Sequence, residues 1–293
     1  METFNNYVES KSDPLGRTSI VIIQGSPRTK KSCSGGNSKT GLMVKKIISL
    51  LPDDIKIDYF DLCVCEDEPK IQACKGCIST ANGYQCHYPC TCYSKGDKKN
   101  PDYMHDKDVY KKMEKADGFV VFSPVNWYAL TTQIKAFFDR LVCINLTLSA
   151  DEIKKILGEN YKNPVYTAKL EDNEKYNYLI KNHYENKVAA FFVHGDEGAN
   201  DYKNRKIPLS LEDYYEEEQN FSVKDAVMPL VHQCRYSGIF VPNEFIKCFT
   251  YGKDNKYFEN NKNFDGPNED FFVKNGIELI KNMVEKIKKM KTK

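Results

Sequence analysis

Residues 19–24 read SIVIIQ and are followed by the loop GSPRTKKSCSGGNSKT at residues 25–40. The apolar, β-branched run predicts a strand that is buried on both faces and stops at Gly25. Beyond the loop, apolar residues recur at helical spacing from Met43 to Leu51, and Pro52 ends that pattern. A strand, a glycine-containing loop and a helix in this order indicate the start of a βαβ unit.

The same alternation continues along the rest of the chain. Further strands are predicted at residues 55–62, 119–122, 188–193 and 238–248, and further helices at residues 106–116, 130–141, 223–236 and 273–287. Parallel strands need long, helical, right-handed crossovers, so this pattern predicts a doubly wound α/β fold with helices on both faces of a five-stranded parallel sheet. The polar alternation in the second strand favours a position near a sheet edge.

The domain organisation follows from the same reading. We expect a flexible N-terminal tail at residues 1–17 and a single domain at residues 18–293. A Cys-rich loop at residues 63–105 and a polar, weakly periodic insertion at residues 145–186 interrupt that domain. In the flavodoxin-like strand order 2-1-3-4-5, the order reverses between strands one and three, and ligands bind at the carboxyl ends of the strands there. The loops after the first, third and fourth strands should therefore converge.

The first of these loops concentrates hydroxyls, small residues and positive charges at the start of a helix. Backbone N–H groups there lack partners and the helix dipole favours negative charge. Asn37 or Ser38 can cap the helix and Arg28 supplies a charged donor, so the loop predicts a phosphate site; a merely polar, capped turn is the alternative. The spacing argues against an NTPase, because Ser38 rather than glycine precedes Lys39-Thr40 and GxGxxG does not occur in this loop.

The other two loops could hold a planar ring. Residues 123–128 contain the one Trp of the chain, Trp127, beside Pro124 and Asn126. A flat heteroaromatic needs an apolar face and a few edge hydrogen bonds, which these residues could supply, although such a loop more often packs against a helix. Residues 194–196, His-Gly-Asp, offer a titratable ring and a flexible backbone at the same edge, with a structural histidine as the alternative.

Composition excludes several classes of protein. The chain has 293 residues, with 43 Lys and Arg against 41 Asp and Glu, so its net charge of +2 provides no basic field for nucleic acid. No stretch approaches the roughly 20 apolar residues of a membrane span, and residues 1–17 lack the apolar segment of a signal peptide. We expect a cytoplasmic protein with no membrane span and no nucleic-acid partner.

Three motifs resemble the flavodoxin-like NAD(P)H-dependent FMN reductases over roughly residues 18–290. Residues 25–28 with 36–38 look like that family's FMN phosphate loop, residues 123–127 with 135–140 like its isoalloxazine loop and following helix, and residues 194–196 like its third flavin contact. The resemblance implies that FMN binds to Ser26, Arg28, Ser34, Asn37, Ser38, Thr40, Pro124, Val125, Asn126, Trp127, His194, Gly195 and Asp196. Residues 29–35 are a long insertion in the phosphate loop, which leaves open whether Ser34 reaches the phosphate.

The Cys-rich loop also resembles the iron-sulfur flavoproteins of the same superfamily. It holds seven of the 11 cysteines of the chain, at positions 63, 65, 74, 77, 86, 90 and 92. Cys74, Cys77, Cys86 and Cys90 are candidate ligands of a zinc ion or an iron-sulfur cluster. Residues 78–85 separate Cys77 from Cys86 more widely than the cysteines are separated in those relatives. Cysteines packed beside the flavin and a redox disulfide therefore remain alternatives to a metal site.

The resemblance implies an FMN-dependent oxidoreductase. NAD(P)H would deliver electrons to bound FMN and be replaced by a small acceptor, such as a quinone, a nitro or azo compound, or free flavin; no side chain need act as acid or base. We expect a homodimer or homotetramer. An electron carrier without NAD(P)H activity, of the flavodoxin or iron-sulfur flavoprotein kind, is the alternative, and the net charge of +2 argues mildly against an acidic carrier.

Overall fold

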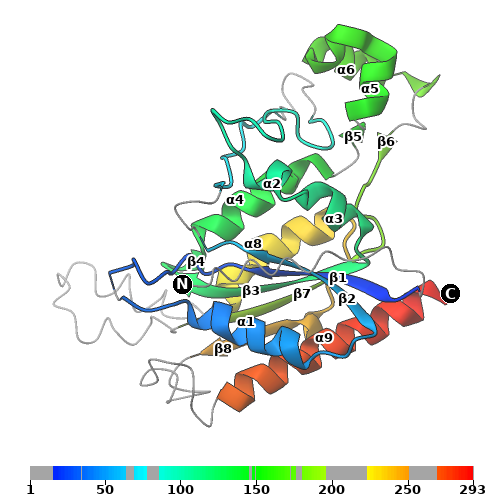
Figure 1. Ribbon diagram of the computed structural model, residues 1–293. Coiled ribbons are helices and arrows are strands. Elements are labelled where there is room, and N and C mark those ends of the chain that lie inside the picture. Colours follow the sequence, from blue (N-terminus) through cyan, green and yellow to red (C-terminus); the bar gives the residue numbers. More distant parts are fainter. Residues whose placement is uncertain are drawn as a thin grey trace, which may run out of the picture.

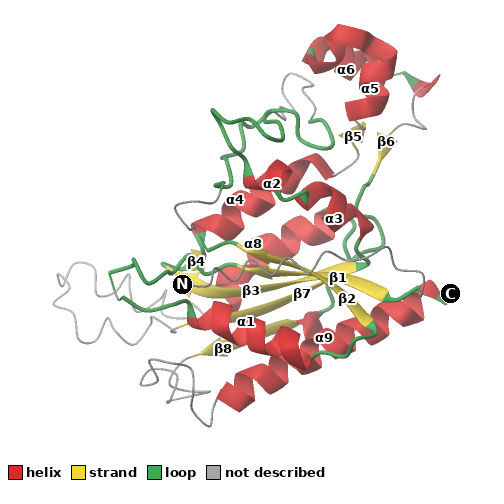
Figure 2. Ribbon diagram, in the orientation of Figure 1, coloured by secondary structure: helices red, strands yellow, loops and turns green. Residues whose placement is uncertain are grey.

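The computed structural model shows a parallel sheet between two layers of helices (Figures 1 and 2). It describes residues 16–33, 35–63, 69–77, 86–144, 147–148, 150–171, 173–175, 180–195, 223–250 and 269–292. The strands are β1 (Thr18–Gln24), β2 (Ile55–Asp61), β3 (Gly118–Asn126), β4 (Ala129–Leu130), β5 (Thr147–Leu148), β6 (Ile180–Lys181), β7 (Val188–Gly195) and β8 (Ile246–Thr250). The α-helices are α1 (Lys39–Leu50), α2 (Tyr103–Asp106), α3 (Val109–Lys115), α4 (Thr132–Arg140), α5 (Ala150–Leu157), α6 (Pro164–Glu171), α8 (Val223–Tyr236) and α9 (Glu269–Lys291).

The sheet has the order β2-β1-β3-β7-β8, and all four of these pairings are parallel. In chain order the five long strands are therefore arranged 2-1-3-4-5, which is the flavodoxin-like order and confirms the predicted fold. The second strand lies at an edge, as its polar alternation indicates. The two-residue β4, which is antiparallel to the end of β3, was not predicted.

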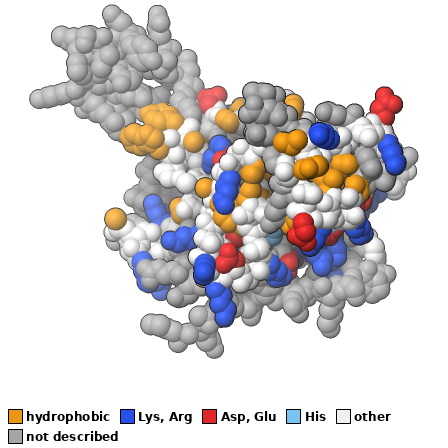
Figure 3. Space-filling view, turned by 90° about the horizontal axis from the view of Figure 1, so that it is seen from above, with side chains coloured by type: hydrophobic (Ala, Val, Ile, Leu, Met, Phe, Trp, Pro, Cys, Tyr) orange, Lys and Arg blue, Asp and Glu red, His pale blue; other side chains and the backbone are white. Residues whose placement is uncertain are grey.

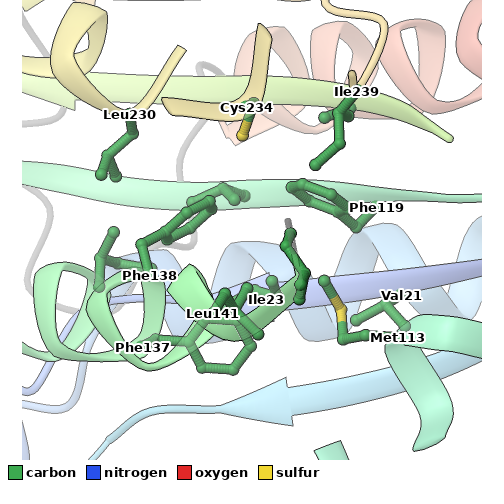
Figure 4. Close-up of a cluster of buried hydrophobic side chains, with 14 of the residues drawn as sticks. Val21, Ile23, Met113, Phe119, Phe137, Phe138, Leu141, Leu230, Cys234 and Ile239 are labelled. Carbon is green, nitrogen blue, oxygen red and sulfur yellow. The ribbon is translucent and has the colours of Figure 1, made fainter. Parts of the chain in front are cut away.

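The central strands are buried on both faces because apolar side chains alternate between two cores. Ile20 and Ile22 pack with α1 and α9, whereas Val21 and Ile23 pack with α3, α4 and α8. Figure 4 shows the second of these cores, in which Phe137 and Phe138 of α4 lie against the sheet. Continuous apolar strands such as SIVIIQ are explained by this two-sided burial.

Two element boundaries differ from the prediction for identifiable reasons. The predicted helix at residues 106–116 is divided into α2 and α3, because Asp108 between them has a left-handed backbone with φ of 53°. The predicted fifth strand began too early. Gly238, with φ of 73°, ends α8: its N–H donates to the Arg235 carbonyl and the next N–H donates to the Cys234 carbonyl. This is a Schellman cap. After it, Phe240 makes an isolated parallel bridge with Val188, and the continuous pairing of β8 with β7 begins at Ile246.

The predicted insertion at residues 145–186 carries secondary structure of its own. The strands β5 and β6 pair antiparallel, and α5 and α6 stand away from the main sheet (Figure 1). Ile153 and Leu170 are buried there against Leu157 and Tyr161, which gives this lobe a small separate core. The sequence predicts the insertion but not the secondary structure and core within it. Of the predicted tail, only residues 16 and 17 are among the described residues.

The length and apolar character of the described helices bear on whether any of them could span a membrane. None of the described helices combines the length and the apolar character needed to cross a bilayer. Seen from above, hydrophobic side chains lie in separate groups among basic and polar ones (Figure 3). The described residues on this face therefore present no continuous apolar band.

Candidate cofactor site at the carboxyl edge of the sheet

The carboxyl ends of β1, β3 and β7 lie side by side. The Gly25 N–H donates to the Phe122 carbonyl at 2.8 Å, and Pro124 is in register with His194. The hydroxyl of Thr131, just before α4, donates to the Gly25 carbonyl at 2.5 Å. The structure thus brings together the three segments whose convergence the sequence predicts.

Two glycines allow this close approach. A Cβ on Gly25 would lie 2.3 Å from Cγ1 of Ile134, and a Cβ on Gly195 would lie 2.7 Å from Cβ of Val125. Any larger residue would push the first loop away from α4 or β7 away from the end of β3. A flexible backbone is predicted at residues 194–196, but β7 runs through Gly195, and this glycine allows close packing against Val125. Asp196 lies outside the described residues.

Hydrogen bonds from the side chain of Gln24, at the end of β1, fix the start of the first loop. Its side-chain amide donates to Oδ1 of Asp61 at 2.7 Å and to the Ser26 carbonyl at 3.1 Å, and its side-chain oxygen accepts from the Ser26 N–H. Gln24 and Ser26 are both buried. The first turn of the loop therefore has a fixed backbone, which is the requirement for a preformed binding site.

The start of α1 has the features of an anion site. Ser38 is the N-cap: its Oγ accepts from the Gly41 N–H at 2.9 Å, while Asn37 beside it is exposed. Lys39 is half-buried, and its pKa is lowered, first by burial and then by the positive charge of Arg28. Two cations thus share the loop at a helix N-terminus, an arrangement that a multiply charged anion would stabilise. Ser34 lies outside the described residues.

Thr40 and His194 form a buried pair that joins this loop to β7. Oγ1 of Thr40 and Nε2 of His194 are 2.9 Å apart, although the residues are 154 positions apart in the chain. Burial lowers the pKa of His194 to about 3, so the ring is neutral at physiological pH. His194 therefore supplies a hydrogen bond rather than a charge, and the placement of Thr40 depends on it.

The predicted ring loop ends in a strained aromatic turn. The strand β3 continues to Asn126, and Asn126 pairs with Ala129 of β4 across the two residues Trp127 and Tyr128. Both have positive φ, 52° and 62°, as in a type I′ turn, which normally takes Asn-Gly. Their rings meet edge to face with centroids 6.1 Å apart. Trp127 is 84% exposed and Tyr128 43% exposed, so burial of the Trp127 side chain does not compensate for the strain.

Backbone strain of this kind clusters at binding and catalytic sites, because the destabilisation is retained only where the strained conformation serves function or is enforced by its surroundings. Pro124 and Val125 are half-buried beside the turn and Asn126 is exposed. The turn therefore offers an aromatic surface and an amide at the edge of the sheet. Trp127 is among the predicted site residues, Lys39 and Tyr128 lie in the predicted loops without a predicted contact to the cofactor, and Thr131 was not predicted. The Trp-Tyr pair gives no recognisable type I′ signal, and Thr131 and Lys39 act through contacts with distant segments.

The Cys-rich loop lies beside this edge and is held by a buried ion pair. Asp102 and Arg140 at the end of α4 have fully buried side chains and form two hydrogen bonds, of 2.7 and 2.9 Å. Arg140 also donates to the Gln72 carbonyl at 3.0 Å and lies 4.5 Å from the ring centroid of Tyr93. The Arg140 guanidinium thereby connects three separate parts of the Cys-rich loop.

The four candidate metal ligands have different partners within the described part of the chain. Sγ of Cys77 is 3.0 Å from Sγ of Cys92, and Cys74 accepts from the Gly76 N–H. A hydrogen bond with Cys143 lowers the pKa of Cys86, whereas burial raises the pKa of Cys90 to about 11. Among the described residues, no three His, Cys, Asp or Glu side chains are grouped as metal ligands.

Comparisons with known proteins agree with the motifs. Residues 18–157 match the family model described as NADPH-dependent FMN reductase. A curated relative, an iron-sulfur flavoprotein from Clostridioides difficile (strain 630), is 33% identical over 121 residues, which cover 41% of this chain and 44% of that protein. The chain therefore matches less than half the length of that relative.

Solved structures share the fold. The crystal structure of RosB with a bound intermediate, 8-demethyl-8-formylriboflavin-5'-phosphate, aligns over 93% of this chain and 81% of its own, with a TM-score of 0.50 and 12% identity. At this identity the likeness concerns the fold alone.

Proposed function

We propose that the protein is an FMN-dependent NAD(P)H oxidoreductase; the match of residues 18–157 to the family model described as NADPH-dependent FMN reductase supports this. Electrons would pass from a nicotinamide cofactor through bound FMN to a small acceptor, such as a quinone, a nitro or azo compound, or free flavin. One observation carries the proposal: an anion loop with two cations and a strained aromatic turn lie at the same edge of the sheet.

The phosphate end of FMN fits the first loop. A phosphate monoester carries close to two negative charges at neutral pH, and Arg28 with Lys39 would balance them. The helix N-terminus of α1 adds N–H donors, and Ser26, Asn37, Ser38 and Thr40 add polar side chains. The neutral His194 keeps the Thr40 hydroxyl in place without adding charge.

The ring end of FMN fits the segment around the aromatic turn. Pro124, Val125 and Trp127 would form an apolar wall, and Asn126 would bond to an edge of the ring. Gly195 lets β7 pack close enough to complete this wall. When bound, FMN supplies the redox chemistry. The chain orients the ring, and the exposed face of the Trp127-Tyr128 turn leaves room for a second planar molecule.

The phosphate assignment is tested by comparing FMN with riboflavin, which lacks the phosphate. Arg28→Ala should weaken FMN about 10- to 150-fold, the value of one charge-assisted hydrogen bond of roughly 1.5 to 3 kcal/mol, and leave riboflavin affinity unchanged. Lys30→Ala removes an exposed charge in the same loop and is the matched control. An equal loss for both flavins would show that Arg28 does not face the phosphate.

The reductase is distinguished from a carrier by anaerobic reduction of the flavin-loaded protein. NADH or NADPH should bleach the bound flavin, and steady-state kinetics with a quinone should be of the ping-pong type, because the two substrates use the same open face in turn. If dithionite bleaches the flavin while neither nicotinamide does so over minutes, the protein is an electron carrier.

A further inference from the structure

Two thiols of the Cys-rich loop touch each other and take no part in the proposed FMN site. Sγ of Cys77 and Sγ of Cys92 are 3.0 Å apart, and both residues are half-buried. We propose that Cys77 and Cys92 form a redox-active dithiol, which closes to a disulfide by exchange with a small polar disulfide such as oxidised glutathione. This proposal does not depend on FMN binding.

The distance favours a disulfide over a shared metal ion. Two thiolates on one tetrahedral zinc, each bonded at about 2.3 Å, are separated by roughly 3.8 Å. The Cys77 and Cys92 sulfurs are closer than that, and a movement of about 1 Å would bring them to the disulfide bond length of about 2.05 Å. Within the described residues they also have no third ligand, as noted above.

The neighbouring cysteines are unsuited to the same reaction. Cys143 is fully buried, and Cys86 and Cys90 are buried too. Cys86 is also hydrogen-bonded to Cys143. A buried thiol is less accessible to a reagent than a half-buried one, so the reactive pair is Cys77 and Cys92.

A hollow beside Cys92 gives a reagent access to the pair. A cavity of about 570 Å³ lies between the Cys-rich loop and the lobe of α5 and α6, and Cys92 and Tyr161 are among its lining residues. This volume is within the range of small-molecule sites. Lys75, Lys95 and Asp97 also line the cavity, and Lys95 is paired with Asp108. The cavity therefore presents charges of both signs, which suits a polar guest that carries both ammonium and carboxylate groups.

The exchange balances without a metal or a flavin. One thiol of the pair, as its thiolate, attacks one sulfur of the small disulfide, and the other sulfur leaves as a thiolate and is protonated. The second thiol of the pair, 3.0 Å away, then loses its proton and attacks the sulfur of the first, which releases the second small thiol. Two protein thiols are oxidised and one disulfide is reduced to two thiols.

The test uses the full chain, reduced and then equilibrated with oxidised and reduced glutathione. After an acid quench and alkylation, the number of free thiols should fall from 11 to nine, and peptide mass spectrometry should find a Cys77–Cys92 crosslink. Cys77→Ser and Cys92→Ser should each abolish this crosslink. Cys74→Ser, three positions from Cys77 in the same loop, should retain it.

Two results would overturn the proposal. One is that no Cys77–Cys92 crosslink forms in the folded wild-type chain at any glutathione ratio. The other is that metal analysis of the freshly isolated protein finds stoichiometric iron or zinc that both Cys77→Ser and Cys92→Ser remove. The wild-type crosslink decides the matter even if a variant fails to fold. Flavin content is measured in parallel and does not enter the outcome.

Discussion

Replacing the Trp127-Tyr128 turn by Asn-Gly should make the protein more stable and less active. An L-residue in the left-handed region costs roughly 1 to 2 kcal/mol, so the two aromatic residues at φ of 52° and 62° store about 2 to 4 kcal/mol. Asn-Gly adopts the same type I′ turn at little cost. Little burial is lost in exchange, because Trp127 is 84% exposed, although Tyr128 is only 43% exposed. We expect the free energy of unfolding to rise by about 1 to 3 kcal/mol.

The gain is measured by urea unfolding of the apo protein, and activity by the rate at which NADH or NADPH bleaches bound flavin. The double variant should unfold at higher urea, keep FMN through the phosphate loop, and be reduced more slowly because the aromatic surface is gone. Tyr236→Ala removes an aromatic side chain that is 82% exposed at the end of α8 and should change stability by less than about 0.5 kcal/mol. A double variant less stable than wild type would refute the strain argument, and an unchanged bleaching rate would refute a role of the turn in catalysis.

Two further predictions concern buried polar groups. Asp102→Asn should lower the free energy of unfolding by about 3 to 5 kcal/mol, because it leaves the buried charge of Arg140 uncompensated. Asp108→Asn, which removes one partner of an exposed ion pair and keeps a residue tolerant of positive φ, should cost less than about 1 kcal/mol in the same urea titration. The pKa of His194 is about 3 in the folded state and about 6.5 in the unfolded state, so between these values the unfolded chain binds more protons and stability falls as the pH is lowered. Between about pH 7 and 4.5 the free energy of unfolding should fall by about 2 to 3 kcal/mol because of this group. In His194→Gln the decrease in stability over the same pH range should be correspondingly smaller. An identical acid loss in wild type and variant would rule out a buried, neutral His194.

The order of strands and helices was predictable because it rests on local, repetitive signals. Two-sided burial makes strands such as residues 19–24 continuously apolar, and helices show their buried stripe at a fixed spacing. The errors occurred where one residue overrides the pattern. Gly238 ends α8 in a left-handed cap where a strand was expected, and Asp108 divides a helix with the same backbone conformation. Both signals are single residues without periodicity.

The site was predictable only to the level of its three segments. Topology determines which strand ends meet, so the convergence of the loops follows from the strand order. The partner of an individual side chain does not follow. Thr40 is predicted as a phosphate ligand, and its contact with His194, which the structure shows, was not predicted. A contact across 154 positions leaves no trace in local spacing, and the type I′ conformation of Trp-Tyr contradicts the preference by which such turns are recognised.

The helix α4 connects the cofactor site with the Cys-rich loop. At its start, Thr131 caps the helix through the Ile134 N–H and donates to the Gly25 carbonyl of the first loop. At its end, Arg140 holds Asp102 and the carbonyl of Gln72. Nine helical residues span about 13 Å, and buried hydrogen bonds fix both ends. Since an α-helix hardly changes length, α4 fixes the distance between Gly25 and the part of the Cys-rich loop that Arg140 holds at Gln72 and Asp102. A change that frees Arg140 should therefore alter that part of the Cys-rich loop before it alters the strand ends.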